Sequence, residues 1–179
     1  PESPLQGLTP AMASLHGSLQ CMEQTWLAEL PPQAAQARFG NPVFRKWSER
    51  LVSRSPSIVE CLLQCHKEYS NISQEYSVDV LQTCAKRGFQ AASVDDSSSQ
   101  PTDNKEEQED VIELRAYLHD AFGHSIRLDF GTGHETSFMV FLFALLKLGC
   151  FGNPTSEPPS PTCVKAVTLS IWTQYLQVT

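Results

Sequence analysis

Apolar residues recur along this chain at spacings of three and four, which is the period of one face of an α-helix. The first such stripe contains Met12, Leu15, Leu19, Met22, Trp26 and Leu30. The dipeptide Thr9-Pro10 ahead of it is a helix start signal, and Pro31-Pro32 stops the pattern. The sequence therefore predicts an opening helix that packs one apolar face into a core.

The same periodicity divides most of the remaining chain into helices. Asn41-Pro42 and Ser55-Pro56 each predict a new helix start, and residues 66–91 predict a weaker helix. A helix that ends at Gly123 should turn inward Val111, Leu114, Leu118 and Phe122. The last helix should turn inward Val164, Val167, Ile171, Tyr175 and Val178. The predicted fold class is all-α.

Two segments depart from the amphipathic pattern. Residues 138–148 are apolar on every side, which is typical of a helix in the middle of a core, and Gly149 fits its C-cap. Residues 125–130 alternate between apolar and polar side chains, which predicts one short extended element.

Charge and composition limit the functions open to the chain. Its 179 residues are 41% apolar and 18% charged, which fits one globular unit. The net charge of −7 comes mostly from residues 93–110, with seven acids and one base. We interpret this stretch as a flexible acidic insertion between the two parts of a helical core, residues 1–92 and 111–179. The nearly neutral remainder argues against nucleic-acid binding, and no apolar run reaches the ~20 residues of a membrane span.

The six cysteines include one close pair, Cys61 and Cys65, next to His66. Zinc sites usually have two tight ligand pairs, and this is a single loose pair, so we predict no metal site. In a chain of this length without CxxC pairs, the cysteines are expected to be reduced thiols of a cytosolic protein.

One polar segment with two glycines interrupts the apolar background, SIRLDFGTGHE at residues 125–135. The glycines flank Thr132 and would let the backbone approach a ligand closely. The start of the following helix offers free N–H groups to a phosphate, Arg127 a bidentate cation and Thr132 a hydroxyl. The alternative that the pattern leaves open is a simple turn, followed by Glu135 as a first-turn acid.

A second cluster, RFGNPVFRKW at residues 38–47, combines bases with aromatic residues. It is either a capped helix with aromatic core residues and two surface bases, or a loop that faces a ligand or partner. In the second case the contacts would come from Arg38, Arg45 and Lys46. We predict that Trp47 and Phe138 belong to the core, because both lie on apolar faces.

Taken together, RFGNPVFRKW and the later RLDFGTGHE resemble motifs of the phosphotyrosyl phosphatase activator family. These proteins activate type 2A protein phosphatase and are also described as peptidyl-prolyl cis-trans isomerases (rotamases). The segments ELRAYLHDAFGHS and FMVFLFALLKLG resemble the family as well. The resemblance covers roughly residues 15–60 and 111–179.

The resemblance implies an all-helical protein of the cytoplasm and the nucleus that binds ATP and magnesium together with the phosphatase catalytic subunit. It also implies a groove for proline-containing peptide segments. By position in the motif, the residues that match nucleotide contacts of the family are Arg127, Thr132 and Gly133. The residues that belong to the same motif without an assigned role are Asp129, Gly131, His134 and Glu135.

Family members continue beyond the point that corresponds to Thr179, with a second glycine-rich stretch ending in Trp-Gly-Leu-Asp-Asp. That stretch would supply the magnesium ligands and much of the peptide groove, so we expect this chain to be a truncated member. Two functions remain open. One is an isomerase that remodels the phosphatase with ATP, for which no nucleophile or triad is needed. The other is a helical module that binds the phosphatase and a nucleotide without chemistry of its own.

Overall fold

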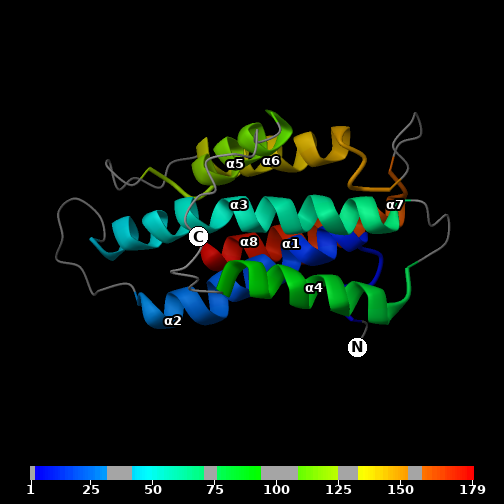
Figure 1. The fold of residues 1–179 in the computed structure, drawn as a ribbon, viewed down its shortest axis with the longest axis horizontal. Coiled ribbons are helices and arrows are strands. Elements are labelled where there is room, and N and C mark those ends of the chain that lie inside the picture. Colours follow the sequence, from blue (N-terminus) through cyan, green and yellow to red (C-terminus); the bar gives the residue numbers. More distant parts are fainter. Residues whose placement is uncertain (1–2, 32–41, 71–75, 94–108, 125–132, 153–158) are drawn as a thin grey trace.

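The all-α prediction is confirmed for the part of the chain that the computed structural model describes, residues 3–31, 42–70, 76–93, 109–124, 133–152 and 159–179. Every regular element in these ranges is a helix (Figure 1). The α-helices are α1 (Pro10–Cys21), α2 (Leu27–Glu29), α3 (Val43–Tyr69), α4 (Val78–Ser93), α5 (Glu109–Asp120), α6 (Gly133–Lys147), α7 (Pro161–Ala166) and α8 (Thr173–Val178). Two π-helical turns join them, η1 (Met22–Trp26) after α1 and η2 (Val167–Trp172) before α8. The extended element predicted at residues 125–130 lies outside the described residues.

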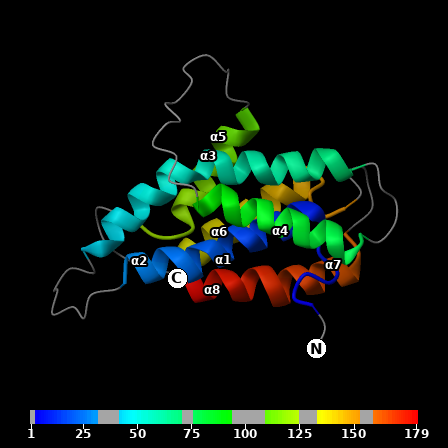
Figure 2. The same ribbon diagram turned by 60° about the horizontal axis from the view of Figure 1, so that its bottom comes forward.

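Helix α1 is the centre of the fold (Figures 1 and 2). It packs against α3, α4, η2 and α8. All of its residues are buried except Gln20, which is half-buried. Helices α5 and α6 pair with each other, and α5 also packs on α3. One short helix with almost no contact with solvent is thus enclosed by α3, α4, η2 and α8.

Two glycines bring the backbones of α1 and α4 together. A Cβ on Gly17 would lie 1.8 Å from the carbonyl oxygen of Ala85, and one on Gly88 would lie 1.9 Å from that of Ser14. No side-chain carbon can approach an oxygen so closely, so only glycine fits at these positions. The Ser18 hydroxyl adds a link by donating to the carbonyl oxygen of Gly88 at 3.0 Å. The two helices therefore meet backbone to backbone.

The start signal at Thr9 and the stop signals at Gly123 and Gly149 are confirmed. Thr9 caps α1 by accepting the Met12 amide at 3.3 Å. Its hydroxyl also donates to the carbonyl oxygen of Cys150 at 2.6 Å, which ties the start of α1 to the segment after α6. Gly123 and Gly149 follow α5 and α6 with φ values of 107° and 80°, a region that favours glycine.

Each π-helical turn coincides with two consecutive spacings of four in an apolar stripe. The residues with these spacings are Met22, Trp26 and Leu30 at η1, and Val167, Ile171 and Tyr175 at η2. Because an α-helical turn holds 3.6 residues, a regular helix would rotate such a stripe away from the core. A π-helical turn, closed by i→i+5 bonds such as that from the Leu27 amide to the Met22 carbonyl, holds more residues and keeps the stripe inward.

The helix break predicted at Ser55-Pro56 is wrong, because α3 continues through Pro56 as one helix of 27 residues. Proline lacks the N–H that would bond to the carbonyl of Val52. The Ser55 hydroxyl replaces that donor and bonds to the same carbonyl at 3.1 Å. Figure 2 shows the helix bending near its middle, as expected where proline interrupts the hydrogen-bond ladder.

Helices reach into both ends of the stretch 93–110, which is predicted to be an acidic insertion. Ser93 is the last residue of α4, and Glu109 opens α5. Acidic side chains favour the first turn of a helix, where they face the positive end of its dipole, so the last acids of the run continue into α5. Residues 94–108, the main part of the predicted insertion, lie outside the described residues.

Two details of the predicted helices also need correction. The weak helix predicted over residues 66–91 is divided, because α3 ends at Tyr69 and α4 begins at Val78. In the last helix Val164 is 45% exposed, although it was predicted to be inward, and Cys163 is buried beside it. The apolar stripe of that helix therefore begins one residue earlier than its valines suggest.

A chain of aromatic rings connects the two sequence motifs through the core. Ring centroids are 5.4 Å apart for Trp26 and Trp47, 5.1 Å for Trp47 and Phe122, and 5.3 Å for Phe122 and Tyr175. Tyr175 stacks on Phe138 with centroids 3.9 Å apart and ring planes at 6°. Trp47 is 5% exposed and Phe138 is fully buried, which confirms both as core residues. The first turns of α6 are thereby fixed on the last helix.

We expect the substitution Gly88→Ala to destabilise the fold strongly. Alanine is favoured over glycine in a helix by about 1 kcal/mol, but its Cβ would overlap the Ser14 carbonyl, and overpacking costs ~1–3 kcal/mol or more. The free energy of unfolding in urea should fall by about 2 kcal/mol or more. Gly133→Ala is the matched control, because a Cβ there meets nothing within 4 Å. Equal stability of the two variants would contradict the direct backbone contact.

Removing the ring of Trp47 should also weaken the core. Trp47→Ala is expected to lower the free energy of unfolding by ~3–5 kcal/mol, because a large buried side chain is lost. Within the described part of the chain the indole Nε1 has no hydrogen-bond partner, so Trp47→Phe should restore much of the stability. Thermal melting of both variants tests this. A melting temperature unchanged by Trp47→Ala would show that the ring does not support the core.

Acid should destabilise the fold through His16. Burial lowers the pKa of His16, whose Nδ1 has no hydrogen-bond partner among the described residues. An unfolded histidine has a pKa of about 6.5, so below this pH the unfolded chain binds a proton that the folded chain does not, and stability falls. The slope is at most about 1.4 kcal/mol per pH unit for one histidine. In urea denaturation between about pH 7.5 and 5, His16→Gln should reduce the slope of the unfolding free energy against pH. An equal slope for the variant and the unchanged chain would show that His16 is not the responsible group.

Candidate functional site

The second sequence motif ends at the start of α6, and the structure describes its last three residues. Gly133, His134 and Glu135 form the first turn of this 15-residue helix. The other residues predicted for the site lie outside the described residues, namely Arg127, Asp129, Gly131 and Thr132. The candidate site is therefore the N-terminal turn of α6 with the side chains around it.

Gly133 leaves the start of α6 open. It is exposed, and a Cβ at this position would meet none of the described residues within 4 Å. The first N–H groups of an α-helix have no partners within the helix and carry the positive end of its dipole. The carbonyl of Gly133 is engaged inside the helix, where it accepts the Ser137 hydroxyl at 3.1 Å. Open access to helix-start amides suits an anion such as a phosphate.

His134 joins the start of α6 to the end of α5. Its Nδ1 lies 2.9 Å from the carbonyl oxygen of Asp120, the last residue of α5. A carbonyl oxygen only accepts hydrogen bonds, so Nδ1 is the donor and holds a proton. The imidazole therefore fixes where the first turn of α6 lies, and this nitrogen is not a base.

Glu135 places a carboxylate in the same exposed turn. Its charge reaches Tyr175, whose pKa is raised by burial and, to a smaller extent, by Glu135. The Tyr175 hydroxyl stays protonated and donates to the carbonyl oxygen of Ala121 at 2.6 Å. Because a carboxylate repels a polyphosphate, such a ligand would bind here best together with a cation that neutralises part of its charge.

The first motif is described from Pro42 onward, and it divides between core and surface. Trp47 is buried, and Phe44 stacks on it with ring centroids 5.8 Å apart. Arg45 and Lys46 are exposed near the start of α3. This part matches a helix with aromatic core residues and two surface bases. Arg38 lies outside the described residues.

A serine–histidine pair that the sequence did not reveal lies between α3 and α5. Nε2 of His119 is 2.6 Å from Oγ of Ser55, and Nε of Arg115 is 3.4 Å from the same oxygen. The single hydroxyl proton of Ser55 goes to the Val52 carbonyl that Pro56 leaves without a donor, so His119 donates to Oγ. The hydroxyl is fully buried, and burial lowers the pKa of His119. The pair therefore joins two helices and does not form an activated nucleophile.

The interpretation of residues 138–148 as a helix buried on all sides is wrong. The inner face of α6 is fully buried, with Phe138 and Phe141 in the core, but Met139 and Phe143 are 60% and 55% exposed. The centre of the fold is occupied by α1, because its small side chains allow neighbours to approach on every side. Helix α6 therefore lies at the surface and exposes apolar side chains.

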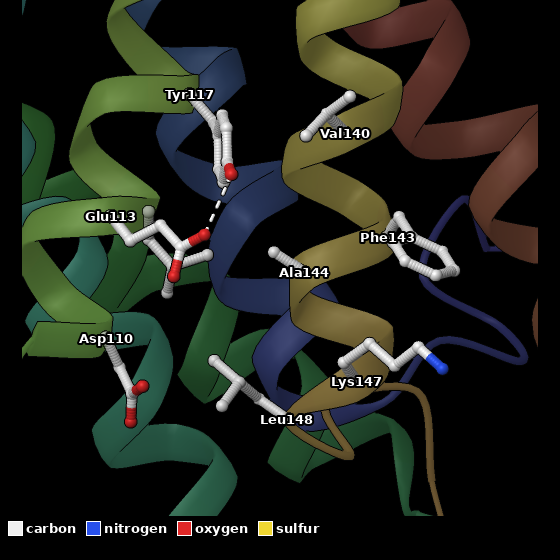
Figure 3. Close-up of a pocket in the computed structure, with 9 residues that line it drawn as sticks. Asp110, Glu113, Tyr117, Val140, Phe143, Ala144, Lys147 and Leu148 are labelled. Carbon is white, nitrogen blue, oxygen red and sulfur yellow. Dashed lines mark hydrogen bonds between the residues drawn. The ribbon is translucent and has the colours of Figure 1, made fainter.

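A groove of about 270 Å³ runs between α5 and α6 (Figure 3). Its lining residues are Asp110, Glu113, Leu114 and Tyr117 on one side and Val140, Phe143, Ala144, Lys147 and Leu148 on the other. The hydroxyl of Tyr117 donates to Oε1 of Glu113 at 2.8 Å and holds this carboxylate at the groove wall. The sequence carried a signal for the groove, because the α6 residues repeat at the i, i+3, i+4, i+7 spacing of a helix contact face.

The described part of the chain contains acidic side chains, six cysteines and five histidines, which are His16, His66, His119, His124 and His134. No group of three or more His, Cys, Asp or Glu side chains in it is placed to hold a metal ion. All six cysteines are free thiols. The pKa of Cys61 is raised by its hydrogen bond with Cys65 and by burial, which keeps it a neutral thiol. None of the described helices has the length and apolar character needed to cross a membrane.

Known proteins resemble this chain over most of its length. The sequence profile described as phosphotyrosyl phosphate activator (PTPA) protein matches residues 3–179. "Serine/threonine-protein phosphatase 2A activator 1" of Emericella nidulans is 33% identical over 153 residues, which cover 85% of this chain and 27% of that protein. "Serine/threonine-protein phosphatase 2A activator" of Drosophila melanogaster is 30% identical over 117 residues, which cover 65% of this chain and 19% of that protein.

The match includes both sequence motifs and the helices that carry them, α3 and α6. This chain spans about a quarter of the length of the curated relatives that it matches. The profile match over nearly all of its residues identifies the family. The chain belongs to the phosphotyrosyl phosphate activator (PTPA) protein family.

Proposed function

We propose that this chain takes part in activating type 2A protein phosphatase, by binding its catalytic subunit together with ATP and magnesium. The proposal follows from membership of a family whose relatives carry the name of phosphatase 2A activators. The observation that carries the site is the open N-terminal turn of α6 at Gly133.

The nucleotide phosphates would be held by Gly133 together with two residues of the same motif, Arg127 and Thr132. The described residues fit this role, because Gly133 is exposed at the start of α6 and His134 fixes the turn on α5. Arg127 would add a charge-assisted contact to a phosphate oxygen. When bound, magnesium would neutralise part of the phosphate charge beside Glu135.

We propose further that activation proceeds by peptidyl-prolyl isomerisation of a proline-containing segment. Rotation about this bond has a barrier of ~18–20 kcal/mol and forms no covalent intermediate. It needs a surface that holds the twisted form more tightly than the planar forms. The buried Ser55–His119 pair does not argue against this mechanism, because isomerisation uses no nucleophile.

The alternative function is a module that binds the phosphatase without isomerase activity. It is favoured by two exposed leucines on the last helix, Leu169 and Leu176, which are 61% and 49% exposed. Exposed apolar side chains of this size are typical of a surface that contacts a partner protein.

Arg127→Ala should weaken ATP binding about ten- to a hundred-fold, because it removes a charge-assisted contact worth ~1.5–3 kcal/mol. Calorimetric titration with and without magnesium measures the affinity. Arg45→Ala is the matched control, since it removes an exposed arginine of the other motif. Gly133→Val should abolish binding by blocking the amides and leave the melting temperature nearly unchanged. Equal losses for Arg127→Ala and Arg45→Ala, or no binding of ATP at all, would refute the nucleotide site.

The phosphatase proposal is tested by capture of this chain on immobilised type 2A catalytic subunit, with ATP and without it. We expect ATP to increase capture and Arg127→Ala to cancel the increase, because the nucleotide would be shared between the two proteins. A parallel assay follows cis-to-trans isomerisation of a proline-containing peptide. Capture with isomerisation supports the first function, and capture without it supports the binding module. Absence of both would overturn the proposal.

A further inference from the structure

Helix α6 carries two contact faces, and only one of them is used within the fold. The inner face consists of Phe138, Phe141 and Leu145, all fully buried. The outer face consists of Val140, Phe143, Ala144 and Lys147, which line the groove beside α5. Residues at i, i+3, i+4 and i+7 are those that one helix presents to another when the two pack. The outer face is therefore built like a helix-packing surface.

The apolar part of this face is large for a surface helix. Phe143 is 55% exposed and Val140 is 37% exposed, with Met139 next to them at 60%. Ala144 lies between Val140 and Lys147 on the helix and allows a second helix to come close. Leu114 and Leu148 line the groove between the two helices. Contiguous apolar surface of this kind marks an interaction site.

The two walls of the groove carry opposite charges (Figure 3). Asp110 and Glu113 lie on the α5 wall, and Lys147 lies on the α6 wall. Tyr117 already holds Glu113 in place by a hydrogen bond, which lowers the entropy lost when this carboxylate pairs with a cation. The Lys147 ammonium lies 5.1 Å from the ring centroid of Phe143, at the outer edge of the same face. The α5 wall is therefore negatively charged and the α6 wall positively charged, so the two walls are complementary.

Self-complementary charges are what a two-fold axis requires, because each copy then supplies the partner group for the other. In Figure 3, Tyr117 lies across the groove from Val140, so Glu113, four residues before Tyr117, lies level with Ala144, four residues after Val140. An axis through Ala144 would place α6 of a second copy antiparallel to the first. Lys147 of that copy, three residues or about 4.5 Å beyond the axis, would then lie between Glu113 and Tyr117.

We propose that the outer face of α6 and the groove beside it bind a second copy of this chain. The two α6 helices pack antiparallel about a two-fold axis near Ala144, with Phe143 and Val140 buried at the centre. Glu113 of each copy pairs with Lys147 of the other. A second copy is the occupant that fits, because it supplies both the apolar stripe and the complementary charges. This inference does not depend on the proposed phosphatase function.

The association state of the full chain tests the proposal. Sedimentation velocity over a range of concentrations in 0.15 M salt should show a monomer–dimer equilibrium. Phe143→Ser should raise the dissociation constant at least about tenfold, because it removes a large apolar side chain from both sides of the contact. Val164→Ser is the matched control, a comparably exposed apolar residue outside the groove, and should change it less than about twofold.

Charge reversal makes the test specific to the pairing. Glu113→Lys and Lys147→Glu should each raise the dissociation constant about tenfold or more, because every charge pair becomes repulsive. A mixture of the two variants should form a dimer again, since each copy then meets an opposite charge. Circular dichroism and melting curves check that the exposed substitutions leave the fold intact.

Three results would overturn the proposal. The first is a chain that stays monomeric at every concentration, which would leave the groove to a different protein. The second is a dimer that Phe143→Ser does not weaken, or that Val164→Ser weakens equally. The third is a mixture of the two charge variants that associates no better than either variant alone.

Discussion

The fold depends on the direct contact between the backbones of α1 and α4. Gly17 and Gly88 each face a carbonyl oxygen of the other helix, where a single Cβ would overlap with it. This contact lets α1 lie inside the molecule, although it contains a histidine and two serines. Helices α3 and α8 pack around α1 as well, whereas α6 pairs with α5 and lies at the surface.

Helix starts and ends could be predicted from the sequence, because their causes are local. Thr9, Gly123 and Gly149 act through their own hydrogen bonds or backbone angles, which need no knowledge of the partner helix. Apolar content alone does not predict that α1 is buried while one face of α6 is exposed. A helix with many small side chains becomes buried because its neighbours can approach it closely, and not because it is the most hydrophobic helix. Pro56 does not end α3, because the neighbouring Ser55 hydroxyl supplies the hydrogen bond that the proline lacks.

The candidate site was predictable to a different degree in each of its parts. The motif located the start of α6, where Gly133 is exposed and accessible. The bond from His134 to the end of α5 depends on how two helices meet, and no spacing in the sequence specifies it. The groove between α5 and α6 combines a stripe that the sequence contains with a wall that only tertiary packing supplies. No sequence pattern predicts the contact between Ser55 and His119, because the two residues are 64 positions apart.

The aromatic chain has an optical consequence. The chain contains three tryptophans, and all of them are in ring contact with this network, Trp26 and Trp47 at one end and Trp172 beside Phe138 and Tyr175 at the other. Their emission and near-ultraviolet circular dichroism therefore report on one connected region that runs from the first motif to the start of α6. Because Tyr175 stacks on Phe138, a change around Tyr175 also alters the surroundings of the other rings in this network. The molecule thus contains an intrinsic spectroscopic probe, Trp172, in ring contact with Phe138 of α6, three residues after the first turn of that helix.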